Sequence, residues 1–72
     1  MQTDKTINIG KAIHDELQKQ ERSVSWMAKK LNINRMQCYR IFKRYCIDTQ
    51  LLLQISLILD YDFFELYSKR MK

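Results

Sequence analysis

The fold is decided by the stretch Ser23-Val-Ser-Trp-Met-Ala-Lys-Lys-Leu-Asn-Ile-Asn34. Ser23 is a good N-cap, because its hydroxyl can accept a hydrogen bond from an unpaired backbone amide of the first helical turn. The residues after it predict a helix over 24–31. Asn32 can end that helix, because Asn tolerates the left-handed backbone conformation better than most residues. Asn34 can then cap another helix over 35–44.

The pattern of small and apolar residues predicts how these two helices pack. Helices that cross at short range need a small side chain at their contact, and Ala28 supplies it. Further apolar residues fall where a buried face requires them, at Met27, Leu31, Ile33, Cys38 and Ile41. Two such helices joined by three residues have the sequence shape of a helix-turn-helix.

The rest of the chain predicts three more helices around this pair. One runs over 9–20 with Ile9, Ala12, Ile13 and Leu17 on one face, and another over 49–59, capped by Asp48 or Thr49, has a core seam of Leu52, Ile55 and Leu59. The run Asp62-Phe-Phe-Glu65 reads as a capping-box variant that opens a fifth helix over 62–69. We therefore expect an all-α, compact five-helix domain over 9–69, with a flexible arm at 1–8 and a tail at 70–72.

Composition narrows the class of protein. Seventy-two residues make one domain, and the absence of Pro with a single Gly favours helices over a β fold. The two cysteines, Cys38 and Cys46, are too few for a disulfide scaffold and lack the spacing of a zinc site. We therefore expect reduced thiols in a cytoplasmic protein, with no metal or cofactor. An enzyme is not expected, since there is one His, His14, and no Gly-rich loop. The most apolar run, 51–59, is too short to span a membrane, which needs roughly 20 residues.

The distribution of charge points to an anionic partner. The chain carries a formal net charge of +5. From Arg22 to Ile47 there is no Asp or Glu, yet this stretch holds seven of the 13 Lys and Arg residues: Arg22, Lys29, Lys30, Arg35, Arg40, Lys43 and Arg44. This pattern predicts contact with a phosphate backbone.

The segments from Ile9-Gly10 through Ser23–Asn34 to Ile55–Leu66 resemble the lambda-repressor-like, or XRE, family of helix-turn-helix domains. The resemblance covers residues 9–67. It implies five helices, the third of which lies in the major groove of double-stranded DNA. The chain departs from the family pattern at Val24, where Gln is usual, and at Asn32 and Asp60, where Gly is usual.

The resemblance assigns roles to the helix over 35–44 and to its neighbours. The N-terminal part of a recognition helix reaches base edges, so the candidates for base contact are Arg35, Met36, Tyr39 and Arg40. Phosphate contacts, which fix position without encoding sequence, are expected from Ser23, Ser25, Lys29, Asn34, Gln37, Lys43 and Arg44. The expected function is that of a small transcriptional regulator.

Some side chains leave alternatives open. The aromatic surplus at the C-terminal helix (Phe63, Phe64 and Tyr67) could close the core or form a homodimer seam. Trp26 could stack on a nucleotide or serve as a half-buried anchor between helices. The alternative function is a protein-interaction module, such as an antitoxin-like or mobile-element accessory subunit.

Overall fold

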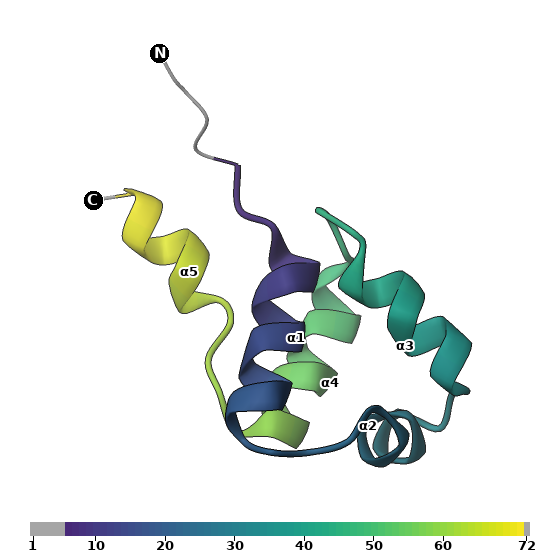
Figure 1. Ribbon diagram of the computed structural model, residues 1–72. Coiled ribbons are helices and arrows are strands. Elements are labelled where there is room, and N and C mark those ends of the chain that lie inside the picture. The colour runs from purple at the N-terminus through teal and green to yellow at the C-terminus, as the bar shows by residue number, and fades with distance from the viewer. Residues whose placement is uncertain (1–5, 72) are drawn as a thin grey trace.

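Capping side chains fix where four of the helices begin. In the computed structural model, which describes residues 6–71, the helices are α1 (Ile9–Lys19), α2 (Val24–Leu31), α3 (Arg35–Phe42), α4 (Thr49–Leu59) and α5 (Glu65–Ser68), followed by the 3-10 turn η1 (Lys69–Met71) (Figure 1). The first four each start after a side-chain oxygen that accepts a hydrogen bond from a backbone amide of the first turn, at Asn8, Ser23, Asn34 and Asp48. The prediction of an all-helical chain is confirmed for the described residues.

Three helices end in the same way, with a residue in the left-handed backbone conformation that is not Gly. These residues are Glu21, Asn32 and Asp60, with φ of 59°, 59° and 53°. At each of them the chain turns back so that two amides reach the last carbonyls of the helix, as in Arg22 N–H to Leu17 O at 3.1 Å and Ile33 N–H to Ala28 O at 2.9 Å. This pairing is the Schellman motif. The predicted end at Asn32 is confirmed, whereas the motif at Glu21 was not predicted.

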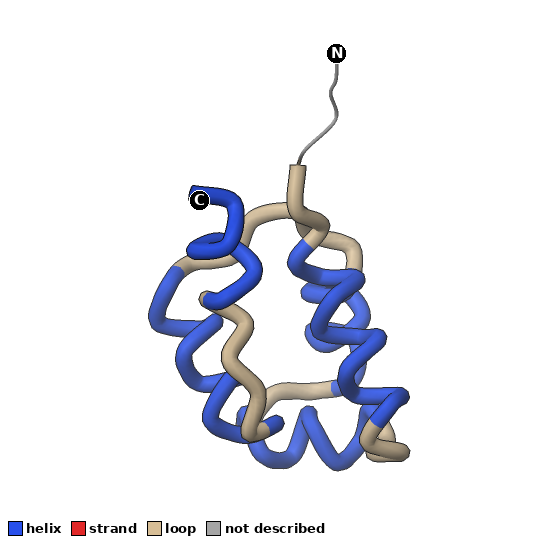
Figure 2. The backbone as a smooth tube through the Cα atoms, turned by 90° about the vertical axis from the view of Figure 1, so that its left-hand side faces the viewer, coloured by secondary structure: helices blue, strands red, loops and turns tan. Residues whose placement is uncertain are grey.

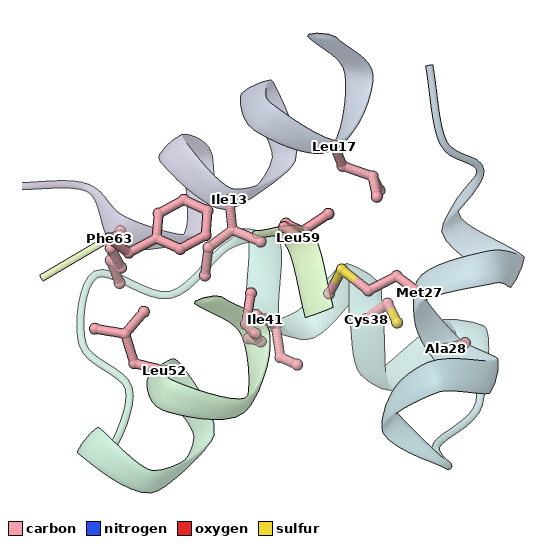
Figure 3. Close-up of a cluster of buried hydrophobic side chains, with 11 residues drawn as sticks. Ile13, Leu17, Met27, Ala28, Cys38, Ile41, Leu52, Leu59 and Phe63 are labelled. Atoms are coloured by element: carbon pink, nitrogen blue, oxygen red, sulfur yellow. The ribbon is translucent and has the colours of Figure 1, made fainter. Parts of the chain in front are cut away.

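One hydrophobic core joins the helices (Figure 3). Its completely buried members include Ile13, Met27, Cys38, Ile55 and Phe63, which come from α1, α2, α3, α4 and the link that precedes α5. The predicted seam of Leu52, Ile55 and Leu59 is confirmed. Leu31 and Phe42, predicted to face inward, are half-buried at the edge of the core.

The helices are arranged around α1 and α4, which lie side by side. Figure 1 shows α3 beside this pair and α2 crossing below it, while α5 lies on the opposite side from α3. Figure 2 shows the same helices joined by loops, and the described residues contain no strand. At the far ends of α1 and α4, the Gln20 amide donates to Leu59 O at 2.7 Å and to Glu16 Oε2 at 2.8 Å, which ties the two C-termini together.

Two predicted helix boundaries are wrong. α3 ends at Phe42 and not at Arg44, because Lys43 N–H and Arg44 N–H bond three residues back, to Arg40 O and Ile41 O, and tighten the last turn. α5 begins at Glu65 and no capping box forms at Asp62. Instead Asp62 Oδ1 accepts from Phe64 N–H at 3.1 Å, which bends the link.

The bent link before α5 explains why Phe63 is buried. Phe63 is completely buried in the chain's own core, because the irregular backbone before α5 lets its ring turn inward. Of the two alternatives left open for the C-terminal aromatic residues, Phe63 takes the first and closes the core, while Phe64 is half-buried and Tyr67 is exposed.

Residues near both predicted ends of the domain take part in helical structure. Asn8, which was assigned to the arm, is the N-cap of α1, and the 3-10 turn η1 continues to Met71. Residues 1–5 of the arm and residue 72 of the tail lie outside the described residues.

Candidate nucleic-acid interface

The outer face of α3 brings together the four residues predicted to contact bases. Helical spacing places Arg35, Met36, Tyr39 and Arg40 on one side of α3, and all four are exposed. Met36 is 64% exposed and Tyr39 50% exposed, although both are large and partly apolar. The Arg40 guanidinium lies 3.8 Å from Met36 Sδ, so these two side chains form a joined surface. Lys43 follows on the same side at the end of the helix and is also exposed.

The inner face of α3 fixes this surface in place. Cys38 and Ile41 are buried, and the half-buried Phe42 stacks on His14 of α1 with ring centroids 4.5 Å apart. Tyr39 lies edge-on to Phe42, with ring centroids 6.0 Å apart. Tyr39 is therefore braced by its own helix while about half of its surface stays in solvent. Through Phe42, His14 adds a contact from α1 to those that the buried Cys38 and Ile41 make with the core.

Two of the residues predicted to contact phosphate, Asn34 and Gln37, cap the start of α3. Asn34 Oδ1 accepts from Gln37 N–H at 2.9 Å, and Gln37 Oε1 accepts from Asn34 N–H at 3.0 Å. This reciprocal pair is a capping box. Because both side-chain oxygens accept backbone amides, the side-chain NH₂ groups are the parts of Asn34 and Gln37 that can donate to an anion.

The start of α2 holds the next group of predicted ligands. Ser23 Oγ accepts from Trp26 N–H at 3.0 Å, and Ser23, Ser25 and Lys29 are all exposed. The N-terminus of α2 lacks an acidic residue in its first turn. Because Trp26 N–H donates to Ser23, the amides that precede it and the partial positive charge of the helix end are the groups that can bind an anion.

Trp26 is a half-buried anchor with cations on its ring. The Arg22 guanidinium lies 4.3 Å from the ring centroid and Lys30 Nζ lies 5.9 Å from it. The ring also packs against the core, as expected for an anchor between helices. Lys30 follows Trp26 by four residues within α2, a helical spacing that predicts their contact, whereas Arg22 precedes the N-cap Ser23 and reaches the ring from outside the helix.

Arg44 and Gln37 line a groove that adjoins the candidate base-contacting face. The groove, of about 270 Å³, lies between α3 and the start of α4, and its lining also includes Arg40, Ile41 and Leu51. Arg40 is therefore shared between the groove and the face. The predicted site residues form one face on α3, an adjoining groove and a patch at the start of α2.

Within residues 6–71, no ion pair neutralises the charge of the stretch from Arg22 to Ile47. The two ion pairs found among the described residues, Lys11–Asp15 and Lys69–Glu65, both lie outside the stretch from Arg22 to Ile47. The acid-free stretch therefore displays its seven cations without carboxylate partners in the described part of the chain.

The two cysteines have different surroundings. Cys38 is completely buried under α3, and burial raises the pKa of its thiol. Cys46 is exposed in the link before α4. Burial, and then the nearby Cys46, raise the pKa of the Tyr67 hydroxyl. These thiols are free, and within residues 6–71 no three His, Cys, Asp or Glu side chains gather as metal ligands would.

No protein-family model, curated protein sequence or solved structure matches this chain. Among the described helices, none has both the length and the apolar character needed to cross a membrane.

Proposed function

We propose that this chain binds double-stranded DNA, with α3 as the recognition helix in the major groove, and acts as a small transcriptional regulator of the lambda-repressor-like type. The observation that carries the proposal is the outer face of α3. An exposed helix face with two Arg, one Lys, a Tyr and a Met, free of acids and braced by the core behind it, suits entry into a groove lined by phosphates.

The side chains on this face suit base edges. Arg35 is exposed at the first position of α3 and Arg40 is exposed in its last turn, and the guanidinium of either can donate two hydrogen bonds to guanine. Met36 offers an apolar contact for a thymine methyl group. Lys43, Lys29 and the amides at the start of α2 are assigned to phosphates, which set the position of the helix on the duplex.

The experiment is fluorescence anisotropy with a random-sequence duplex over a range of salt concentrations. For about five phosphate contacts, the slope of log K against log salt is expected to be roughly −4 to −5. The double variant Arg35→Ala/Arg40→Ala should bind at least tenfold more weakly. Both side chains are exposed, so circular dichroism should report an unchanged fold.

A matched control separates a specific surface from net charge. Lys11→Ala/Lys69→Ala also removes two positive charges, but these come from exposed ion pairs on α1 and at the end of α5. We expect this control to bind nearly as well as the parent chain. If both double variants weaken DNA binding equally, the loss of affinity comes from the lower net charge and not from a specific surface on α3. No binding at low salt by the folded protein would favour the protein-interaction module.

A further inference from the structure

Helix α4 buries one apolar face in the core and leaves two further leucines exposed on its outer side. Its sequence, Thr-Gln-Leu-Leu-Leu-Gln-Ile-Ser-Leu-Ile-Leu, contains no charged residue. Leu52, Ile55 and Leu59 are buried in the core. On the outer side Leu53 is 45% and Leu57 is 71% exposed. Leu53 and Leu57 lie one helical turn apart, between the exposed side chains of Gln50 and Gln54, and form an apolar stripe that the described part of the chain does not cover.

Leu57 stands as a ridge between two grooves. One groove, of about 410 Å³, lies between α4 and the link to α5, and its lining includes Leu53, Leu57 and Phe64. The other, of about 240 Å³, lies between α4 and α2, and its lining includes Leu57, Ile58 and Leu31. Helical geometry puts Leu53 and Ser56 on one side of Leu57, and Gln54 and Ile58 on the other. Ridges that enter grooves are the usual means by which helices pack.

The two grooves have opposite charge. The groove beside Phe64 contains Asp60 and Asp62, while the groove beside Leu31 contains Lys30. The acidic groove also contains Ser56, whose buried Oγ has no hydrogen-bond partner among the described residues. A buried hydroxyl without a partner carries a free-energy cost that an incoming polar group would remove.

We infer that the outer face of α4 binds a second copy of this chain, in a two-fold pair whose α4 helices run in the same direction. The occupant follows from the arrangement of the charges. When the two-fold axis lies between the two α4 helices and runs parallel to them, the groove on one side of Leu57 in one copy faces the groove on the other side of Leu57 in its partner. The Asp60 and Asp62 groove of each copy then faces Lys30 of its partner, and the apolar stripe of Leu53 and Leu57 meets its own copy.

The opposite direction is disfavoured by the same charges. In a pair with antiparallel α4 helices, each groove would face its own kind, so the carboxylates of Asp60 and Asp62 would approach those of the second copy. The seam on α4 differs from the one considered at the C-terminal end in that it is centred on Leu53 and Leu57, shares only Phe64 with it, and leaves Phe63 buried in the core. The inference does not depend on DNA binding, and its test contains no DNA.

The test is sedimentation equilibrium of the whole chain over about 1 µM to 1 mM. We expect a reversible monomer–dimer equilibrium that Leu57→Glu shifts at least tenfold toward monomer. Met71→Glu is the matched control, because Met71 is also a large exposed apolar residue, 87% exposed, and lies on η1 away from the α4 stripe. Since Leu57 is mostly exposed, its variant should keep the melting temperature of the folded monomer.

Charge reversal tests the direction of the pair. Lys30→Glu should weaken the dimer several-fold, whereas Lys19→Glu, an exposed change of the same charge that lines neither groove, should leave it intact. A chain that stays monomeric over the whole range, or a dimer that Leu57→Glu does not weaken, overturns the inference. A dimer that Leu57→Glu weakens and Lys30→Glu strengthens overturns the parallel direction.

Discussion

The backbone amide of Gly10 donates a hydrogen bond to the carbonyl oxygen of Arg44 across 2.9 Å. The first turn of α1 thereby meets the C-terminal end of α3, and an unpaired amide satisfies an unpaired carbonyl. The approach is so close that a Cβ on Gly10 would come within 3.0 Å of backbone oxygens of Ile41, Phe42 and Arg44. This contact holds the proposed recognition helix against the body of the domain.

Gly10→Ala should therefore destabilise the fold. Helix propensity alone predicts the opposite sign, a gain of up to about 1 kcal/mol. Backbone atoms cannot move aside as a flexible side chain can, so we expect a net loss of about 1–3 kcal/mol. Urea unfolding followed by circular dichroism measures it. A variant as stable as the parent chain would contradict the close approach.

Glu21→Gly should stabilise the domain. Glu21 has φ of 59° at the end of α1, a conformation that costs a residue with a Cβ roughly 1 kcal/mol and costs Gly almost nothing. We expect a rise in the free energy of unfolding of up to about 1 kcal/mol. Asn32→Gly should gain less, because Asn tolerates this conformation. If Asn32→Gly gained more than Glu21→Gly, strain at Glu21 would not be the cause.

Gln20→Ala should loosen the join between α1 and α4. The half-buried Gln20 amide donates a hydrogen bond to Leu59 O at 2.7 Å, and the substitution removes this hydrogen bond. A net loss of about 1 kcal/mol is expected in thermal or urea unfolding. Gln18→Ala, an exposed change on the same helix, serves as the control and should alter stability by less than about 0.5 kcal/mol. Similar losses in both variants would remove the special role of Gln20.

Cys38 should make stability fall in alkaline solution. Burial raises the pKa of its thiol above the ordinary value, so the native state keeps a proton that the unfolded chain releases. Stability is unaffected below the ordinary thiol pKa and declines as the pH rises from there toward the native pKa. Urea unfolding over about pH 7–10 measures the decline.

Two variants isolate the thiol responsible. Cys38→Ala lowers stability overall, since it leaves a cavity, but should remove this part of the pH dependence. Cys46→Ser should retain it, because Cys46 is exposed. In the native protein a thiol reagent should modify Cys46 first. Rapid modification of Cys38 at neutral pH would show that α3 opens easily.

Met36→Ala and Lys43→Ala should affect DNA binding differently. Met36 is assigned to a base edge, so its loss should alter the ranking of bound sequences in a selection from random duplexes. Lys43 is assigned to a phosphate, so its loss should weaken all sequences equally and reduce the salt slope by about 1. Identical binding preferences in the parent chain and Met36→Ala would remove Met36 from base contact.

The sequence by itself determined the helices and much of the candidate interface. Ser23, Asn32 and Asn34 each favour one local backbone state, because a cap or a left-handed turn is set by neighbours within a few residues. The apolar spacing of Met27, Ala28 and Cys38 likewise determined which side faces the core. The same spacing placed the exposed side chains of α3 on one face.

The tertiary structure decided what depends on residues far apart in the chain. The hydrogen bond from Gly10 to Arg44, just past the end of α3, and the burial of Phe63, just before α5, are contacts that no local pattern encodes. The support of Phe42 by His14 and the join of Gln20 to Leu59 have the same origin. Local propensities differ by about 1 kcal/mol or less, so burial of one aromatic ring or one close backbone contact is enough to move a helix boundary.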